Sequence, residues 1–170
     1  MTRKAYFAGG CFWCVTPTFA ALGGVKQVVS GYSGGEEAPT YAEVKAQKTA
    51  HRETVAVEYD PDVIPFSALM DAFLANVDPF DGGGQFIDRG RSYTLAVYYT
   101  SDDERQIAES AIRALEATAG KTVFVALEPF RSFFPAEEEH QNFWQKQPEA
   151  FERELIESGR KPIPGKETPA

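Results

Sequence analysis

Two cysteines, Cys11 and Cys14, are the only cysteines in this chain of 170 residues, and they stand three positions apart. A chain of this length with one close pair is not a disulfide scaffold, so the spacing indicates a redox-active or metal-binding pair. Cys11 follows a predicted strand and Gly9-Gly10, where a helix is predicted to begin. Unpaired backbone N–H groups and the helix dipole favour a thiolate there. We therefore predict that Cys11 is a nucleophile; a buried structural cysteine is the alternative.

The residues after Cys11 extend this hypothesis. A thiol at Cys14 is placed to attack an oxidised Cys11 and form a disulfide, and a small buried apolar residue is the alternative. Phe12 and Trp13 are larger than the residues that thioredoxin-type motifs hold between their cysteines. Two aromatic rings beside a nucleophile indicate an apolar pocket for a small group such as a methyl. Core packing is the other interpretation, and it suits Phe12 better than Trp13.

Glu53 is the most informative carboxylate. Residues 51–59 alternate with period two, which predicts a strand with Glu53 on the same face as Val55 and Val57. A carboxylate on an apolar face is unfavourable unless it is partnered or neutral, and desolvation raises its pKa. A protonated carboxyl group is a usable general acid at neutral pH. A solvent-exposed edge position is the alternative. His51 shares the face of Glu53 and is expected to be structural.

A zinc site is the other chemistry that the sequence raises. Cys11, Cys14, His51 and His140 make a two-cysteine, two-histidine set, but the histidines lack the spacing of a ligand pair, so no metal is predicted. The chain has 17 basic and 25 acidic residues, which argues against nucleic acid or an anionic membrane as partner. Without an apolar run of about 20 residues or a signal-peptide core, we expect a soluble, cytoplasmic protein.

The elements that position these residues follow from the apolar pattern. Strands alternate with helices, which predicts a sheet with helices packed on it, in a single domain over residues 1–158 followed by a tail over 159–170. Tyr41, in a short predicted helix, and Tyr93, at the start of a predicted strand, are candidate hydroxyl donors. The predicted strands are 4–8, 25–31, 51–59, 93–100 and 122–127; the helices are 11–22, 39–47, 66–77, 101–120 and much of 136–158; 78–90 is a glycine-rich loop.

Several separate segments resemble the type A peptide methionine sulfoxide reductases, and the resemblance runs from about Ala5 to Pro148. Residues 8–14 are similar to the family's Gly-Cys-Phe-Trp signature, in the variant with cysteine after the tryptophan. The further matching blocks are Gly31-Tyr32-Ser33-Gly34-Gly35, Pro39-Thr40-Tyr41, His51-x-Glu53 with Tyr59-Asp60-Pro61, Asp78-Pro79, Gly84-Gln85-Phe86, Asp88-x-Gly90-x-x-Tyr93, and Phe134-Pro135-Ala136-Glu137 with His140-Gln141.

The resemblance implies an α+β fold, a two-layer α/β sandwich of the ferredoxin-like plait type with a mixed sheet. It also implies a reaction with methionine-S-sulfoxide, free or peptide-bound, since each epimer has its own enzyme. In that reaction Cys11 would attack the sulfoxide sulfur. Phe12 and Trp13 would hold the substrate's methyl group. Glu53 would protonate the oxygen, and the products would be methionine and a sulfenic acid on Cys11.

The remaining implied roles concern the oxygen and the second half of the cycle. Tyr41 and Tyr93 would hydrogen-bond the sulfoxide oxygen, and Asp88 would orient this network. Many relatives carry resolving cysteines near the C-terminus, but this chain has no cysteine after Cys14, so Cys14 or an external thiol would resolve the sulfenic acid. The resemblance implies thioredoxin as reductant, with glutaredoxin or a small thiol as alternatives. No prosthetic group and a monomer are expected.

Two departures from the family pattern are Ala50, where glycine is usual, and Thr94-Leu95, where a more polar pair is common. We expect neither to abolish activity. A general thiol–disulfide oxidoreductase using Cys11 and Cys14 is the second functional hypothesis. Disulfide exchange needs no acid for a sulfoxide oxygen, so Glu53, Tyr41 and Tyr93 discriminate between the two.

Overall fold

A mixed six-stranded sheet with strand order β7-β6-β1-β3-β2-β8 forms the centre of the molecule in a computed structural model, which describes residues 1–158. Neighbouring strands pair antiparallel, except for the parallel pair β6 and β7. The strands are β1 (Arg3–Gly9), β2 (Val25–Ser33), β3 (Arg52–Tyr59), β6 (Leu95–Tyr99), β7 (Val125–Pro129) and β8 (Phe134–Pro135).

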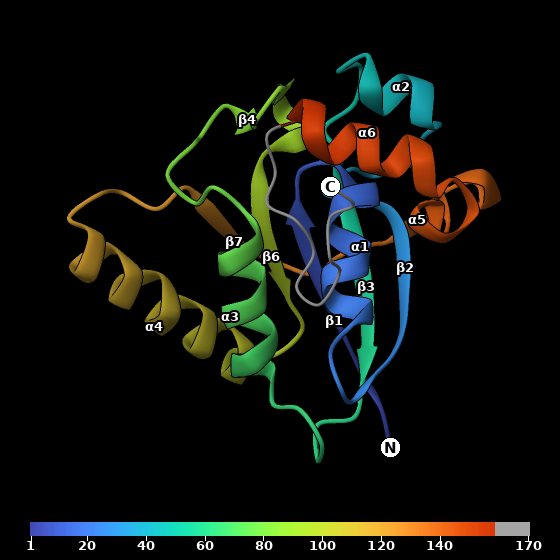
Figure 1. Ribbon diagram of the computed structural model, residues 1–170. Coiled ribbons are helices and arrows are strands. Elements are labelled where there is room, and N and C mark those ends of the chain that lie inside the picture. Colours follow the sequence, from blue (N-terminus) through green and yellow to red (C-terminus); the bar gives the residue numbers. More distant parts are fainter. Residues whose placement is uncertain (159–170) are drawn as a thin grey trace.

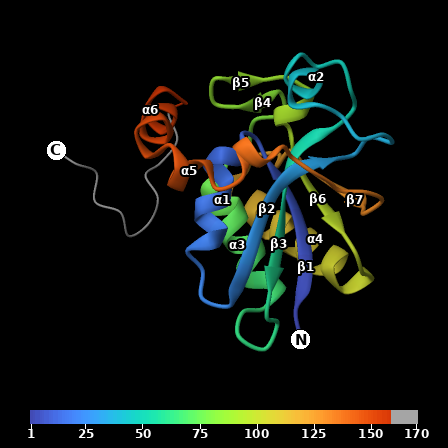
Figure 2. The same cartoon turned by 90° about the vertical axis from the view of Figure 1, so that its right-hand side faces the viewer.

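Helices pack against one face of this sheet (Figures 1 and 2). They are α1 (Phe12–Ala20), α3 (Phe66–Asn76) and α4 (Asp102–Ala119). α1 contacts β2 and β3, α3 contacts β1, and α4 contacts β6 and β7. The predicted arrangement of a sheet with helices packed on it is confirmed. Within residues 1–158, none of the helices is both long and apolar enough to span a membrane.

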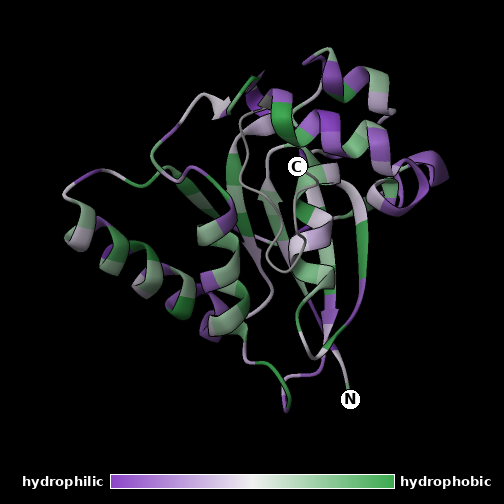
Figure 3. Cartoon of the chain, viewed as in Figure 1, coloured by the Kyte–Doolittle hydropathy of each residue, from purple (hydrophilic) through white to green (hydrophobic). Residues whose placement is uncertain are grey.

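The core lies between the helices and the sheet. Phe7 of β1 stacks on Phe19 of α1 with ring centroids 4.9 Å apart and on Phe66 of α3 at 5.8 Å, and the tilted ring of Phe73 lies 5.2 Å away. Figure 3 shows hydrophobic residues concentrated on the central strands and on α1 and α3. Burial of these rings stabilises the layer that holds the end of β1 in place.

The opposite face of the sheet is covered by the aromatic loop that follows β7. Phe130 stacks on Tyr6 of β1 at 4.1 Å, and Phe133 lies 5.6 Å from the same ring. Residues on this face of β3 are buried as well, with Arg52 4% and Thr54 0% exposed. Period-two alternation identified the face that carries Glu53, but it did not indicate that the other face is also buried.

Short elements gather at the end of the sheet where β1 finishes, and Figures 1 and 2 show α2, β4 and α6 at this end. They are α2 (Tyr41–Lys45), β4 (Gly84–Gln85), β5 (Asp88–Arg89), η1 (Arg91–Tyr93), η2 (Glu138–His140), α5 (Phe143–Lys146) and α6 (Pro148–Ser158). The predicted interruption near Pro148 is confirmed, because α6 begins there.

Two sequence-based expectations need correction in this region. The glycine-rich segment 78–90 is not wholly a loop, since β4 and β5 form a short antiparallel pair within it. Tyr93 does not begin a strand; it ends the 3-10 helix η1. Gly90 has φ of +119°, and the Tyr93 N–H donates to its carbonyl at 3.0 Å, so the chain turns before β6 starts at Leu95. The predicted tail, 159–170, lies outside the described residues.

The predicted start of α4 is partly confirmed. Ser101 is the N-cap, and its hydroxyl accepts the Glu104 N–H at 3.2 Å. The Glu104 carboxylate does not complete the predicted capping box, because it accepts from the N–H of Thr100 at 2.9 Å instead. Gly120 ends the helix in the left-handed conformation, as the sequence indicated.

Candidate active site

Cys11 lies at the N-cap of α1, as predicted. Gly10, with φ of +86°, turns the chain between the end of β1 and the first helical residue, and the Cys14 N–H donates to the Cys11 carbonyl at 3.1 Å. Both cysteines are thiols, and they are only 6% and 1% exposed. The nucleophile candidate therefore sits where the N–H groups of a helix end favour negative charge, with the second thiol one turn further on.

Glu53 reaches the first turn of the same helix. Its Oε1 accepts the backbone N–H of Phe12 at 3.1 Å, and the side chain is 1% exposed. Val55 and Val57, on the same face of β3, are fully buried. The predicted burial of this carboxyl group is confirmed, and its hydrogen bond holds it one residue from Cys11.

Aromatic rings surround the segment between the two cysteines. Phe12 is 1% exposed, and its ring lies 6.1 Å from that of Tyr41. Trp13 is half-buried between the imidazole of His140 at 5.7 Å and the ring of Phe143 at 4.2 Å. Its indole Nε1–H donates to Nδ1 of His140 at 3.3 Å. The rings of Phe12, Trp13 and Tyr41 thus make an apolar wall beside Cys11.

Tyr41 and Tyr93 both lie near Cys11 and Glu53. Burial raises the pKa of the Tyr41 hydroxyl well above its ordinary value, and the nearby charges of Glu53, Cys11, Asp88 and Glu154 add to the effect. Burial also raises the pKa of Tyr93, again with a contribution from Glu53. Both phenols therefore stay protonated across the neutral range and can donate hydrogen bonds.

Hydrogen bonds hold the segments that carry Tyr41 and Tyr93. Glu137 accepts the Tyr41 backbone N–H through Oε2 at 3.1 Å and the Tyr32 hydroxyl through Oε1 at 3.0 Å. The Gln47 side chain donates to the Ser92 hydroxyl at 2.7 Å and accepts the Ser92 N–H at 3.0 Å. Since Gln47 follows α2 and Ser92 belongs to η1, the segments that carry the two phenols are tied together.

Arg52 supports η1 from the opposite face of β3. Its Nε donates to the Thr94 hydroxyl at 2.8 Å, and its Nη1 donates to the Tyr98 hydroxyl at 3.0 Å and pairs with Glu128. Thr94 directly follows Tyr93, so this buried guanidinium holds the end of η1. Thr94, which departs from the family pattern, is thus hydrogen-bonded to Arg52.

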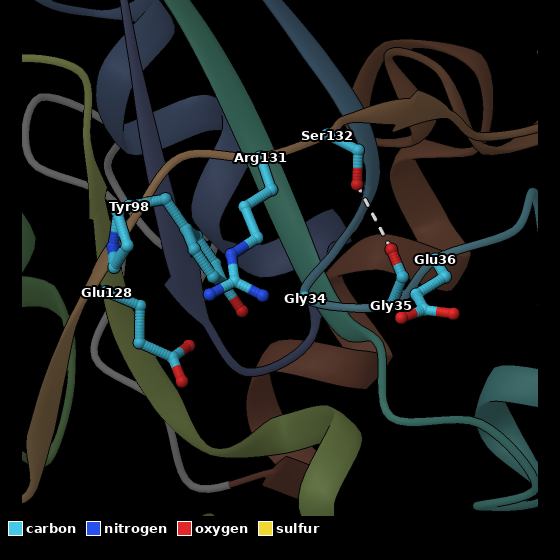
Figure 4. Close-up of a pocket in the computed structure, with 8 residues that line it drawn as sticks. Gly34, Gly35, Glu36, Tyr98, Glu128, Arg131 and Ser132 are labelled. Atoms are coloured by element: carbon cyan, nitrogen blue, oxygen red, sulfur yellow. Dashed lines mark hydrogen bonds between the residues drawn. The ribbon is translucent and has the colours of Figure 1, made fainter.

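A cavity of about 400 Å³ lies beside Tyr98 and Glu128, two of the side chains that Arg52 contacts (Figure 4). Tyr98 and Glu128 line it together with Arg131, and Ser132 donates from its hydroxyl to the Gly35 carbonyl at 3.1 Å. Its lining residues include none of the eight predicted site residues. The cavity is separate from the group around Cys11.

Asp88 and a residue that sequence reasoning missed, Glu154, complete the surroundings of Cys11. One ligand atom from each of Cys11, Asp88 and Glu154 lies within 4.8 Å of the other two. Glu154 belongs to α6, which lies next to α1 (Figures 1 and 2). Phe151, one turn earlier, is 1% exposed and packs with both cysteines, and Leu155 joins the same cluster.

The sequence indicated only in part that α6 packs over Cys11 and Cys14. Phe151, Glu154 and Leu155 have the spacing of one helix face, and the segment was predicted to be helical. Helical periodicity shows which residues share one face of the helix, but it does not show which other part of the protein that face contacts. The contact with residues near the start of the chain could therefore not be assigned.

The two histidines contact different segments. His51 is buried with its ring against Phe134 and the backbone of Gly35, and burial lowers its pKa. His140 lies against Trp13 and Tyr41, and burial lowers its pKa too. Among residues 1–158, the groups with metal-ligand geometry are Cys11 with Asp88 and Glu154, and Glu137 with Glu139 and His140. Neither matches the two-cysteine, two-histidine set considered above.

Comparison with known proteins adds an independent observation. Residues 3–168 match the family model described as peptide methionine sulfoxide reductase. The chain is 43% identical over 159 residues to peptide methionine sulfoxide reductase MsrA of Bacillus velezensis, a match that covers 92% of this chain and 90% of the relative. It is 42% identical over 161 residues to the protein of the same name from Halalkalibacterium halodurans, covering 93% and 92%.

Solved structures agree with these matches. Mxr1 from Saccharomyces cerevisiae in its reduced form aligns with a TM-score of 0.83 at 27% identity, covering 87% of each chain. Methionine sulfoxide reductase A of Corynebacterium diphtheriae aligns with a TM-score of 0.78 at 29% identity, covering 86% of this chain and 76% of the other. With the family model spanning nearly the whole sequence, this chain belongs to the peptide methionine sulfoxide reductase family.

Proposed function

We propose that this protein reduces methionine-S-sulfoxide, free or peptide-bound, to methionine by thiol chemistry at Cys11. The observation that carries the proposal is the placement of two groups on the first turn of α1. Cys11 is the N-cap, and the carboxyl group of Glu53 accepts the N–H of the next residue at 3.1 Å. A thiolate beside a buried acid is what attack on a sulfoxide requires, because the oxygen leaves sulfur only when it is protonated.

In the first half of the cycle, the Cys11 thiolate attacks the sulfoxide sulfur while Glu53 gives its proton to the oxygen. Tyr41 and Tyr93, which stay protonated, donate hydrogen bonds to that oxygen, and Asp88 orients them. The substrate's methyl group lies against Phe12 and Trp13. Methionine leaves, and Cys11 is left as a sulfenic acid.

In the second half, Cys14 attacks the Cys11 sulfenic acid, and a disulfide and water form. A thioredoxin then reduces the disulfide. Support for this reductant comes from the yeast relative Mxr1, for which a structure in complex with Trx2 is known; it aligns with this chain at a TM-score of 0.56 and 18% identity. No prosthetic group takes part in any of these steps.

Residues 1–158 form a single catalytic domain that works as a monomer in the cytoplasm. We assign its β1-α1-β2-β3-α3-β6 core to the ferredoxin-like plait, supported by that chain order and by the strand order β6-β1-β3-β2.

The test is thioredoxin-coupled reductant consumption with separated S and R epimers of methionine sulfoxide. The unchanged chain should consume reductant with the S epimer alone, and Cys11→Ser should consume none. Cys14→Ser should form one methionine per chain and then stop, because no other internal thiol can resolve the sulfenic acid. Sustained cycling by Cys14→Ser contradicts the resolving role. Reduction of protein disulfides without any sulfoxide reduction would favour the general thiol–disulfide oxidoreductase.

A further inference from the structure

The second half of the cycle has a chemical requirement that Glu53 does not meet. When Cys14 attacks the sulfenic acid, the Cys11 S–O bond breaks and the oxygen must leave as water, which takes a proton at that oxygen. Glu53 has by then given its proton to the sulfoxide oxygen. Another acid close to the Cys11 sulfur is therefore needed if the step is to be assisted.

Glu154 is placed to supply this proton. Its carboxylate oxygen lies within 4.8 Å of Cys11 Sγ and of an Asp88 oxygen. A sulfenic acid oxygen lies one bond from Sγ, and rotation about the Cβ–Sγ bond can bring it towards these two carboxyl groups. Two carboxylates this close repel each other when both are ionised, and holding one proton between them relieves the repulsion.

The helix that carries Glu154 also covers the thiol pair. Phe151 and Leu155 pack in one cluster with Cys11 and Cys14, and Phe151 is buried. Glu154 is therefore next to Cys11 when α6 lies over both sulfurs, which is the arrangement in which Cys14 has to reach Cys11. Water is largely excluded there, since the two cysteines are 6% and 1% exposed. The carboxyl group of Glu154 therefore takes the place of water as the proton source.

We infer that Glu154 is the catalytic acid of the disulfide-forming step, and this inference rests on the proposed function. The Cys14 sulfur forms a bond to Cys11 Sγ as the S–O bond breaks. The Glu154 carboxyl gives its proton to the departing oxygen, and water leaves. The thiol proton of Cys14 goes to the Glu154 carboxylate, which restores the acid. The Cys11 sulfur is reduced and the Cys14 sulfur is oxidised, so the step needs no outside reagent.

Glu154→Gln tests this assignment, with Glu152→Gln as the matched control. Both remove one carboxylate from α6, but Glu152 is exposed. After one equivalent of methionine-S-sulfoxide is added, methionine, Cys11 sulfenic acid and disulfide are measured against time. Dimedone traps the sulfenic acid, mass spectrometry locates it, and the loss of thiols reports the disulfide.

Glu154→Gln should form one methionine per chain as the unchanged chain does, yet it should accumulate dimedone-reactive Cys11 and form the disulfide about 10²-fold to 10⁴-fold more slowly. Glu154→Asp should recover part of the rate, and Glu152→Gln should behave like the unchanged chain. Disulfide formation at the unchanged rate in Glu154→Gln overturns the inference. Loss of the first methionine in that variant also overturns it, because Glu154 would then act before the sulfenic acid forms. If the unchanged chain itself formed no methionine, the proposed function would be the part that failed.

Discussion

Replacing Phe151 with alanine should uncover Cys14. Phe151 is 1% exposed and packs on both cysteines, so it anchors α6 over the thiols. Burying a phenylalanine side chain contributes about 1.5–3 kcal/mol. We take about 2–3 kcal/mol as the loss of α6 docking. Since 1.4 kcal/mol is a factor of ten, the population with α6 detached should rise about 30-fold to 150-fold.

The assay is alkylation of Cys14 by iodoacetamide in a Cys11→Ser background, where Cys14 is the only thiol. When opening and closing are fast compared with alkylation, the labelling rate follows the detached population. Phe151→Ala should therefore label about 30-fold to 150-fold faster than the parent chain. Ile156→Ala is the control, because Ile156 lies on the same helix but is 77% exposed. Equal labelling rates for the two variants would refute the idea that α6 covers the thiols through Phe151.

Glu53→Gln should slow the first methionine formed per chain by about 10²-fold to 10⁴-fold, because the amide cannot give a proton to the sulfoxide oxygen, while iodoacetamide alkylation of Cys11 stays unchanged. An unchanged single-turnover rate in rapid-quench measurements would exclude Glu53 as the acid. Stability should fall with decreasing pH as His51 and His140 are forced to protonate. Burial lowers both pKa values below the usual 6.5, so the unfolded chain binds protons at a higher pH than the folded chain does. The free energy of unfolding therefore decreases as the pH falls below about 7. Urea unfolding between pH 8 and 5 measures this, and the slope should be shallower in a His51→Gln, His140→Gln double variant; an equal slope would contradict the assignment.

Sequence reasoning located the parts of the site that depend on short-range pattern. Cys11 was predictable because a strand, two glycines and a helix start are all local signals. The face of Glu53 followed from alternation along one strand, and its burial was confirmed. In both cases the position of a side chain was determined by residues within about one turn or one strand of it.

Other parts depended on contacts between distant segments. Tyr93 was assigned to a strand because Leu95, Val97 and Tyr99 continue an alternating pattern, yet the turn at Gly90 keeps it outside that strand. Glu154 had no motif at all, and only the packing of α6 brings it to Cys11. Helical periodicity is compatible with many partner surfaces, so the identity of the partner is decided by tertiary packing.

The position of α6 also has a consequence during synthesis. Cys11 and Glu154 are 143 positions apart (154 minus 11), and the ribosome makes the thiol pair first and its cover late. At about 5–20 residues per second, roughly 7–30 s pass between them. Throughout that interval the nascent chain carries two cysteines without the helix that buries them. Oxidants and electrophiles in the cell thus meet this pair more readily on a growing chain than on a finished one.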